Sequence, residues 1–382
     1  MRVLFRYSAS MDKQQDKSAT APETPSPAKP RRASALWQGL TQVQNSDRRW
    51  EMPLAAALAS GLPLLVGAYF GRMDYGLLSS LGGMVFLSLP NSPLQHRMMV
   101  LLAASFGMVS CFAVGALTQI WPTLMVPALT LIAMVVNMVC RCYCFPPPGS
   151  LFFIMAAAIA AYTPGTLEQV PLRVGMVAMG ALLACGVAFV YALHMARVAP
   201  PPPAPELPAP SFDFVVYDSV IIGLFVGISL LLAELLQLPR PYWVPVSCLA
   251  VIQGASLQAA LVRQLHRIVG TSLGLLLAWA LLSLPLNAWS LSLVMMVLSF
   301  GIETLIVRHY ASAVVLITPL TIFLAEAPHL GHSPSSAVIQ GRFLDTVLGA
   351  CIGLCGAWLI HNQRVRPHLT RWMRAILPRR ID

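Results

Sequence analysis

The sequence predicts an all-α integral membrane protein with about twelve transmembrane helices, arranged as two tandem six-helix repeats. Three observations predict this fold class. The 382 residues are 57% hydrophobic and only 10% charged, whereas soluble domains carry roughly 25% charged residues. Apolar segments long enough to cross a bilayer recur along the chain. Residues of the same type also recur in the two halves at a nearly constant separation.

Twelve apolar segments are candidates for spanning helices, because a helix needs about 20 residues to cross the hydrocarbon core. The first six are expected near residues 53–70, 75–90, 98–118, 122–140, 148–163 and 172–196. The second six are expected near 214–236, 241–257, 264–284, 288–307, 310–327 and 341–361. A Pro-rich stretch from Pro200 to Pro210 separates the two groups and predicts a semi-rigid linker.

These segments divide the chain into five parts. Residues 1–50 form a basic cytoplasmic tail that we expect to be disordered, since it is rich in Pro, Ser, Ala and Lys. The first repeat covers 51–197, the Pro-rich cytoplasmic linker 198–212, the second repeat 213–362, and a basic cytoplasmic tail 363–382. No signal peptide is recognised, so we expect the first spanning helix to direct insertion.

Arginines predict the orientation, because positively charged loops stay in the cytoplasm. With both termini inside, four arginines are external, namely Arg72, Arg173, Arg240 and Arg342. Twelve are then cytoplasmic, and flipping the chain would reverse this bias. The twelve are Arg48, Arg49, Arg97, Arg141, Arg197, Arg263, Arg267, Arg308, Arg364, Arg366, Arg371 and Arg374.

The repeat is visible in pairs of identical residues. Five pairs are separated by 167 positions, and two pairs, Arg173 with Arg342 and Gly180 with Gly349, by 169. Six spans per copy is an even number, so we expect a pseudo-two-fold axis along the membrane normal. The five pairs are Tyr75 with Tyr242, Ser80 with Ser247, Gly107 with Gly274, Arg141 with Arg308, and Tyr143 with Tyr310.

Small residues recur at a spacing of four, which brings them to one face of a helix and lets helix backbones approach closely in lipid. We assign these faces to helix packing rather than to substrate contact. The three sets are Gly107, Cys111 and Gly115; Gly270, Gly274 and Ala278; and Gly349, Gly353 and Ala357.

Several function classes are not supported. The net charge of +10 lies mainly in the two tails, which favours positive-inside anchoring over nucleic-acid binding. No Walker, HExxH or triad signature is present, so we predict no enzyme, no catalytic residue and no cofactor. Cys140, Cys142 and Cys144 form a cluster that could hold a soft metal, but no histidine or fourth ligand is near in the sequence, so we predict no metal site.

Ionisable residues within spans are candidates for function, because each costs about 2.5–3.5 kcal/mol at a helix centre. Glu303 precedes Arg308 by five residues and is interpreted either as an ion-pair partner of an arginine or as a protonatable carrier or gate. Asp345 follows Arg342 by three residues and is interpreted either as an intrahelical ion pair or as part of proton coupling. Asp218 and Glu234 are weaker candidates.

Anion entry is predicted at the start of the ninth helix. Arg263 and Arg267 are one turn apart, so they share a face on the cytoplasmic side. They are interpreted either as positive-inside anchors or as an electrostatic funnel for anions. Tyr242 and Trp243 are interpreted either as interfacial belt residues or as flat faces for an aromatic substrate.

At these residues the sequence resembles the fusaric acid resistance family, which includes aromatic acid exporters. The resemblance covers roughly residues 50–362. Its motifs are PYWVPVS at 241–247, then Gln253, RIVGTSLG at 267–274, RHYA at 308–311 with Thr318-Pro319, and RFLDTVLG at 342–349; FPPPG at 145–149 is similar to a segment of the first half.

The resemblance implies export of small organic acids, aromatic carboxylates in particular, across the bacterial inner membrane. An anionic substrate, the lipid bilayer, a periplasmic membrane-fusion protein and a second copy of the chain are the expected partners. Many family members carry sizeable cytoplasmic domains after each helical unit, whereas the central linker and the C-terminal tail of this sequence are both short. The fold also resembles plant aluminium-activated malate transporters, so an anion channel and a membrane scaffold stay open as alternatives, as does proton coupling.

Overall fold

The computed structural model describes residues 40–46, 48–146, 148–198, 202–203, 211–326 and 335–376. Residues 42–382 form one compact unit, and of the separate unit 1–41 only Leu40 and Thr41, both helical, are described. The expected disordered tail and Pro-rich linker therefore lie largely outside the described residues. Every helix and contact discussed below belongs to the unit 42–382.

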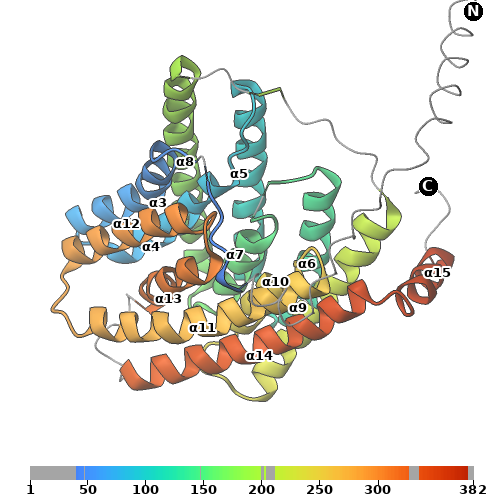
Figure 1. Ribbon diagram of the computed structural model, residues 1–382. Coiled ribbons are helices and arrows are strands. Elements are labelled where there is room, and N and C mark those ends of the chain that lie inside the picture. The colour runs from blue at the N-terminus through green and yellow to red at the C-terminus, as the bar shows by residue number, and fades with distance from the viewer. Residues whose placement is uncertain are drawn as a thin grey trace, which may run out of the picture. The chain divides into compact units, whose positions relative to one another are not determined.

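The first half of this unit contains six α-helices in the described part of the chain. The two longest, α5 and α8, run steeply in Figure 1, and short 3₁₀ turns link several of the others. The helices are α3 (Glu51–Tyr69), α4 (Met73–Gly83), α5 (Leu94–Leu117), α6 (Met125–Cys142), α7 (Leu151–Tyr162) and α8 (Val170–Val198).

The second half repeats this order of long and short helices and adds one more. In Figure 1 its longest members, α11 and α14, lie across the lower part of the view and pack against each other. The helices are α9 (Asp218–Leu235), α10 (Trp243–Ile252), α11 (Leu257–Leu282), α12 (Ala288–Leu305), α13 (Tyr310–Glu326), α14 (Ser335–His361) and α15 (Arg366–Ile376).

Eight helices in the described residues are long and apolar enough to cross a membrane, by length and composition. A helix occurs at each of the twelve predicted segments, but α4, α7, α10 and α13 are shorter than these eight. Of the about twelve expected spans, eight correspond to helices long enough to cross a membrane, and the other four correspond to shorter helices. The eight are built on α3, α5, α6, α8, α9, α11, α12 and α14.

Two predicted boundaries in the second half are wrong. The segment 241–257 forms a helix only as far as Ile252, and α11 begins at Leu257 rather than near 264. The reason is local: the side chain of Ser256 accepts a hydrogen bond from the backbone N–H of Ala259 at 3.1 Å and so caps α11. Arg263 and Arg267 consequently lie inside α11 instead of opening it.

The helices pack in corresponding pairs within the two halves. α4 packs against α8 as α10 packs against α14, and α5 packs against α7 as α11 packs against α13. Between the halves, α3 packs against α12 and α6 packs against α9. The fourth helix of each half therefore contacts the first helix of the other.

Glycines allow these helices to approach closely, as predicted from their spacing. A Cβ on Gly349 would lie 2.3 Å from the carbonyl oxygen of Val244 in α10, and one on Gly180 would collide with Ser79 in α4. A Cβ on Gly274 would lie 2.7 Å from the carbonyl oxygen of Val315 in α13. The assignment of the small-residue faces to helix packing is confirmed at Gly274 and Gly349.

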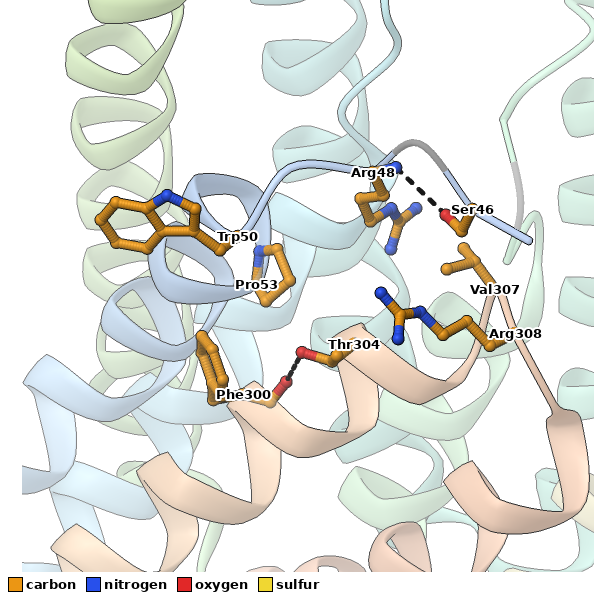
Figure 2. A pocket seen from close by; sticks show the side chains of 8 residues that line it. All are labelled: Ser46, Arg48, Trp50, Pro53, Phe300, Thr304, Val307 and Arg308. Atoms are coloured by element: carbon orange, nitrogen blue, oxygen red, sulfur yellow. Dashed lines mark hydrogen bonds between the residues drawn. The ribbon is translucent and has the colours of Figure 1, made fainter. Parts of the chain in front are cut away.

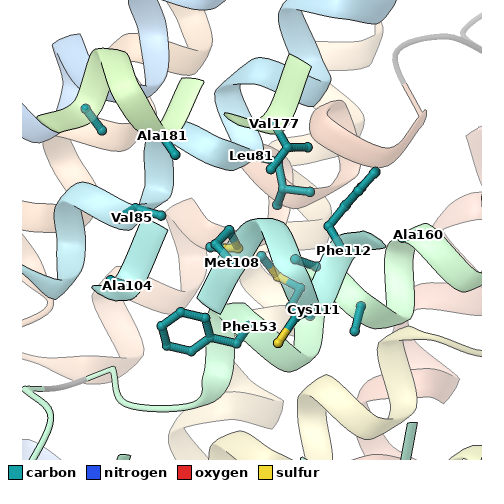
Figure 3. Close-up of a cluster of buried hydrophobic side chains, with 14 of the residues drawn as sticks. Leu81, Val85, Ala104, Met108, Cys111, Phe112, Phe153, Ala160, Val177 and Ala181 are labelled. Atoms are coloured by element: carbon teal, nitrogen blue, oxygen red, sulfur yellow. The ribbon is translucent and has the colours of Figure 1, made fainter. Parts of the chain in front are cut away.

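The largest buried cluster joins the helices of the first half. Figure 3 shows its centre, where Met108 and Phe112 of α5 lie among side chains of α4, α7 and α8. Alanines dominate the α7 side of this cluster, since residues 156–158, 160 and 161 are all buried alanines. Small side chains let the short helix α7 sit deep between longer neighbours.

The basic C-terminal tail contains a helix that the sequence analysis did not predict. In α15, Leu369 and Met373 pack against the buried cluster of the second half, whereas Trp372 is exposed. The guanidinium of Arg366 lies 3.3 Å from the carboxylate of Asp218 at the start of α9. This helix is therefore held to the second half by apolar packing and by an ion pair.

Candidate functional site

The short helix α10 is the structural centre of the candidate site. Each of its ten residues is buried, and it packs against α14, α9 and α11. A helix of this length extends about 15 Å, half of the roughly 30 Å of hydrocarbon that a spanning helix must cross. Both ends of α10 therefore lie within the protein, and polar side chains gather along it.

Arg342 lies at the amino end of α10. Its guanidinium carbon is 3.7 Å from the ring centroid of Trp243, and its Nη2 donates a hydrogen bond to Oγ1 of Thr321 at 3.1 Å. The Arg342 residue is only 5% exposed. This places two predicted site residues, Trp243 and Arg342, in direct contact, with the neighbouring Tyr242 ring 5.1 Å from Trp243.

Asp345 lies one turn further along α14 and is fully buried, with 0% exposure. Neither of its carboxylate oxygens has a hydrogen-bond partner among the described residues. The intrahelical ion pair with Arg342 therefore does not form, because the Arg342 guanidinium extends towards Trp243 and Thr321 instead. A buried carboxylate without a partner is energetically unfavourable, so its retention indicates a role.

Arg267 reaches the middle of α10 from α11. Its Nη2 donates to Oγ of Ser247 at 3.1 Å and its Nη1 to the hydroxyl of Tyr310 at 3.5 Å. Arg267 is 6% exposed, and its Nε–H has no partner in the described part of the chain. Arg267 thus lies inside the protein, because α11 begins at Leu257, and its placement at the cytoplasmic mouth stays a prediction.

Arg263 shares the α10-facing side of α11 with Arg267, as their spacing predicted. Its Nη1 lies 3.5 Å from the carbonyl oxygen of Ala250, and its guanidinium is 5.7 Å from the Tyr310 ring centroid. The ring of His266 stands 4.9 Å from that of His309. Sequence analysis missed this histidine pair, since His266 lies in α11 whereas His309 lies 43 positions later, directly before α13.

A buried hydrogen-bond chain lies at the carboxyl end of α10. The Gln253 amide donates to Oγ of Ser150 at 2.7 Å, and that hydroxyl donates to Oδ1 of Asn137 at 2.7 Å. The chain joins residues of the first half to the second half. In the sequence, Asn137 could have indicated this chain of hydrogen bonds, because a buried amide within an apolar helix requires hydrogen-bond partners.

Glu303 and Arg308 lie elsewhere, near the end of α12. The Glu303 carboxylate pairs with Arg48 at 2.9 Å, so the expected partner Arg308 is wrong. The sequence could not reveal the true partner, which lies 255 positions away. Glu303 lies on α12, which packs against α3 and α13. Arg308 lies in the turn after α12, directly before His309, whose ring is 4.9 Å from that of His266 in α11.

Asp218 forms a third charged group, at the junction of α6 and α9. Its carboxylate lies 3.0 Å from the guanidinium of Arg141 and 3.3 Å from that of Arg366. The weak candidate from the sequence is thus a buried carboxylate with two arginine partners. This arrangement favours a structural role, the joining of α6, α9 and α15.

Comparisons with known proteins agree with the motifs. Residues 228–356 match the family described as fusaric acid resistance protein-like, and this segment contains all eight residues predicted for the site. The chain is also 30% identical over 141 residues to an uncharacterized membrane protein, YvaC, of Bacillus subtilis. That alignment covers 37% of this chain and 22% of the relative.

No solved structure matches the chain. The family match and the eight apolar helices long enough to span a bilayer together indicate a multi-pass, transporter-like membrane protein. The family expected from the sequence motifs is therefore confirmed over residues 228–356, which match the fusaric acid resistance protein-like family.

Proposed function

We propose that this protein exports small organic acids, aromatic carboxylates in particular, across the bacterial cytoplasmic membrane. The observation that carries the proposal is the buried Arg267, held between Ser247 and Tyr310 in the middle of an apolar helix. A buried guanidinium is costly in a span and is retained where it serves a substrate or ion pathway. Its Nε–H is available for a substrate carboxylate.

The α10 site offers the two features that an aromatic acid requires. Guanidinium groups bind carboxylates through paired hydrogen bonds, which lysine cannot reproduce. Tyr242 and Trp243 supply flat rings at the opposite end of the same short helix. We therefore assign anion binding to Arg263 and Arg267, and aromatic contact to Tyr242 and Trp243.

Proton coupling is assigned to Asp345, with Arg342 as its neighbour. Asp345 is buried without a hydrogen-bond partner among the described residues, so a proton can bind there without first breaking an ion pair. Glu303 and Arg308 are assigned to gating at the end of α12, where Glu303 already holds Arg48. The two groups are separate in the fold and can act in different steps of a cycle.

The proposal includes a repeated architecture of twelve spans in two six-helix units, related by a pseudo-two-fold axis along the membrane normal. Its support is the matching order of long and short helices and the matching helix pairs in the two halves. Short segments at corresponding positions of two repeats are typical of substrate sites in transporters. Here the second and fifth helices of each half are the short ones.

A periplasmic membrane-fusion protein and a second copy of the chain are proposed as partners of the exporter. Both termini and the linker are proposed to be cytoplasmic on the basis of the arginine distribution. Chemical cross-linking in intact cells, followed by purification of the full-length protein, tests the partners. Recovery of the protein only as a monomer without cross-linked partners would count against both.

The first test replaces Arg267 by lysine. Charged hydrogen bonds contribute about 1.5–3 kcal/mol, so losing the paired geometry should lower export about tenfold to a hundredfold. The measurement is accumulation of radiolabelled benzoates in everted membrane vesicles. Arg72→Lys is the matched control, because Arg72 is exposed just before α4 and its ion-pair partner, Asp74, is also exposed.

Three outcomes would contradict this assignment. Unchanged export by a correctly inserted Arg267→Lys variant would remove Arg267 from substrate binding. Ion currents from the purified wild-type protein in planar bilayers would indicate an anion channel instead of a carrier. Unaltered resistance of a deletion strain to a panel of organic acids would reject the substrate class.

A further inference from the structure

A pocket of about 200 Å³ lies between the start of α3 and the end of α12. Figure 2 shows its charged side chains, in which the guanidinium groups of Arg48 and Arg308 point towards one another. The backbone N–H of Gln44 donates to the carbonyl oxygen of Arg308 at 2.9 Å and holds the two segments together. The pocket is lined by Ser46, Arg48, Trp50, Pro53, Phe300, Thr304, Val307 and Arg308.

The charges in this pocket are not balanced. Arg48 is neutralised by Glu303 at 2.9 Å. The guanidinium of Arg308 forms no hydrogen bond and no ion pair with any other residue in the described ranges, and Arg308 is exposed. Among the described residues, two cations face one carboxylate here, so the described lining carries a net positive charge and is suited to an anion.

The corresponding arginine in the first half, Arg141, has an ion-pair partner within the chain. Arg141, 167 positions earlier, lies at the end of α6, where α6 packs against α9. Its guanidinium pairs with Asp218 at 3.0 Å and lies 4.4 Å from the ring centroid of Phe214. The charge of Arg141 is therefore balanced by a residue of the chain. At the contact between α3 and α12, the guanidinium of Arg308 can instead bind a ligand.

An apolar stripe leads along α12 to the pocket. Leu293, Val297 and Phe300 are spaced by four and three residues, so they share one face with Thr304, and Val297 is 70% exposed. The stripe from Leu293 to Thr304 is about 16 Å long, close to the roughly 15 Å depth of one hydrocarbon leaflet. Trp50, 64% exposed, stands at the pocket, and tryptophan favours the headgroup level of a membrane.

We propose that this pocket binds an anionic phospholipid of the cytoplasmic leaflet. Arg308 holds the phosphate with Arg48, Trp50 lies beside the headgroup, and an acyl chain follows the stripe on α12. Basic pockets between transmembrane helices on the cytoplasmic side bind such headgroups. The leaflet follows from the proposed topology, whereas the site itself is independent of the transported substrate.

The experiment measures thermal stability of the purified full-length protein in detergent with added lipid. Phosphatidylglycerol is expected to raise the melting temperature, whereas phosphatidylcholine of the same chain length is not. Glycerophosphoglycerol, which lacks acyl chains, and inorganic phosphate are expected to have little effect, because neither contacts the stripe. In Arg308→Gln the shift caused by phosphatidylglycerol should fall by at least half.

Arg173→Gln is the matched control and should keep the full shift, because Arg173 donates to backbone carbonyl oxygens in the loop before α8. An equal shift in Arg308→Gln, or an equal shift with phosphatidylcholine, would overturn the lipid site. An equal shift with inorganic phosphate or benzoate would identify a site for free anions instead. If Arg308→Gln does not fold, native mass spectrometry of the wild-type protein is used instead. Preferential binding of phosphatidylglycerol over phosphatidylcholine supports the lipid site, and equal binding overturns it.

Discussion

The two buried carboxylates assigned to the transport cycle differ in one respect. Glu303 has a guanidinium partner, Arg48, which also lies 3.3 Å from the Glu303 carbonyl oxygen. Asp345 has no hydrogen-bond partner in the described part of the chain. The ion pair with Arg48 holds the Glu303 carboxylate, whereas no described residue holds that of Asp345. This difference leads to opposite expectations for their neutral variants.

We expect Glu303→Gln to be less stable but to keep the pH dependence of export. The variant loses the ion pair with Arg48, which is partly exposed and contributes about 1 kcal/mol or less. Its melting temperature and its membrane level should both fall. The measurements are thermal unfolding of the purified variant and export by vesicles over a range of cytoplasmic pH.

Asp345→Asn is the comparison variant. Asparagine removes a buried charge without a partner, so its stability should be equal to or higher than that of the wild type. Its export should become independent of pH. If pH dependence disappears in Glu303→Gln and persists in Asp345→Asn, the coupling role belongs to Glu303.

At the residue scale, sequence identified the charged residues but not all of their partners. The spacing of Arg263 and Arg267 predicted a shared face because both lie on one helix. The partner of Glu303 could not be predicted, since Arg48 is brought to it only when α3 packs against α12. Arg308 was expected to pair with Glu303 because the two are close in sequence. In the fold, Glu303 pairs with Arg48 instead.

Among the elements, the short helix α10 depends on close contact with α14. A Cβ on Gly349 would lie 2.3 Å from the carbonyl oxygen of Val244, and one on Gly353 would lie 2.5 Å from that of Cys248. No side chain can be added there without separating the two backbones. The helix pair therefore acts as one packed unit that carries Trp243, Arg342 and Asp345 together.

Gly349→Val should strongly destabilise the second half. Overpacking typically costs about 1–3 kcal/mol, and here the obstacle is backbone, which cannot move aside as a side chain does. The expected result is a lower melting temperature and reduced recovery from membranes. Gly186→Val is the control, since nothing lies within 4 Å of the Cβ position on Gly186 of α8. Equal stability of the two variants would refute the close contact.

Element boundaries show where hydrophobicity is informative and where it fails. Long apolar runs predicted all eight long helices, because the bilayer requires such lengths. The gap between α10 and α11 was expected at residues 258–263 but lies at 253–256, because a single hydroxyl, that of Ser256, caps α11. α15 was missed because hydropathy detects spans, whereas this helix is basic and amphipathic and packs through Leu369 and Met373.

For the whole molecule, the proposed repeat rests on corresponding contacts between helices. Arg141 lies in the last turn of the fourth helix of its half and Arg308 just after the fourth helix of the other half, and Gly180 and Gly349 both face the second helix. The residue pairs in the sequence predicted these correspondences because packing requires the same small residue at the same contact. The contacts between the halves, α3 with α12 and α6 with α9, could not be predicted from the pairs of identical residues in the sequence.

Reporter fusions test the proposed orientation of the whole chain. Alkaline phosphatase fused after Asp382 should be inactive, because the basic C-terminal region is expected to stay in the cytoplasm. The same enzyme inserted after Gly165, in the loop between α7 and α8, should be active. High activity of the C-terminal fusion alone would require the opposite orientation.

The ion pair between Arg48 and Glu303 has a consequence for synthesis of the chain. The two residues are 255 positions apart, and ribosomes add about 5–20 residues per second, so about 13–50 s separate their appearance. One face of α3 and the guanidinium of Arg48 stay uncovered during that interval. The first helix to be inserted is thus among the last to be enclosed, and the insertion machinery must shield it until α12 emerges.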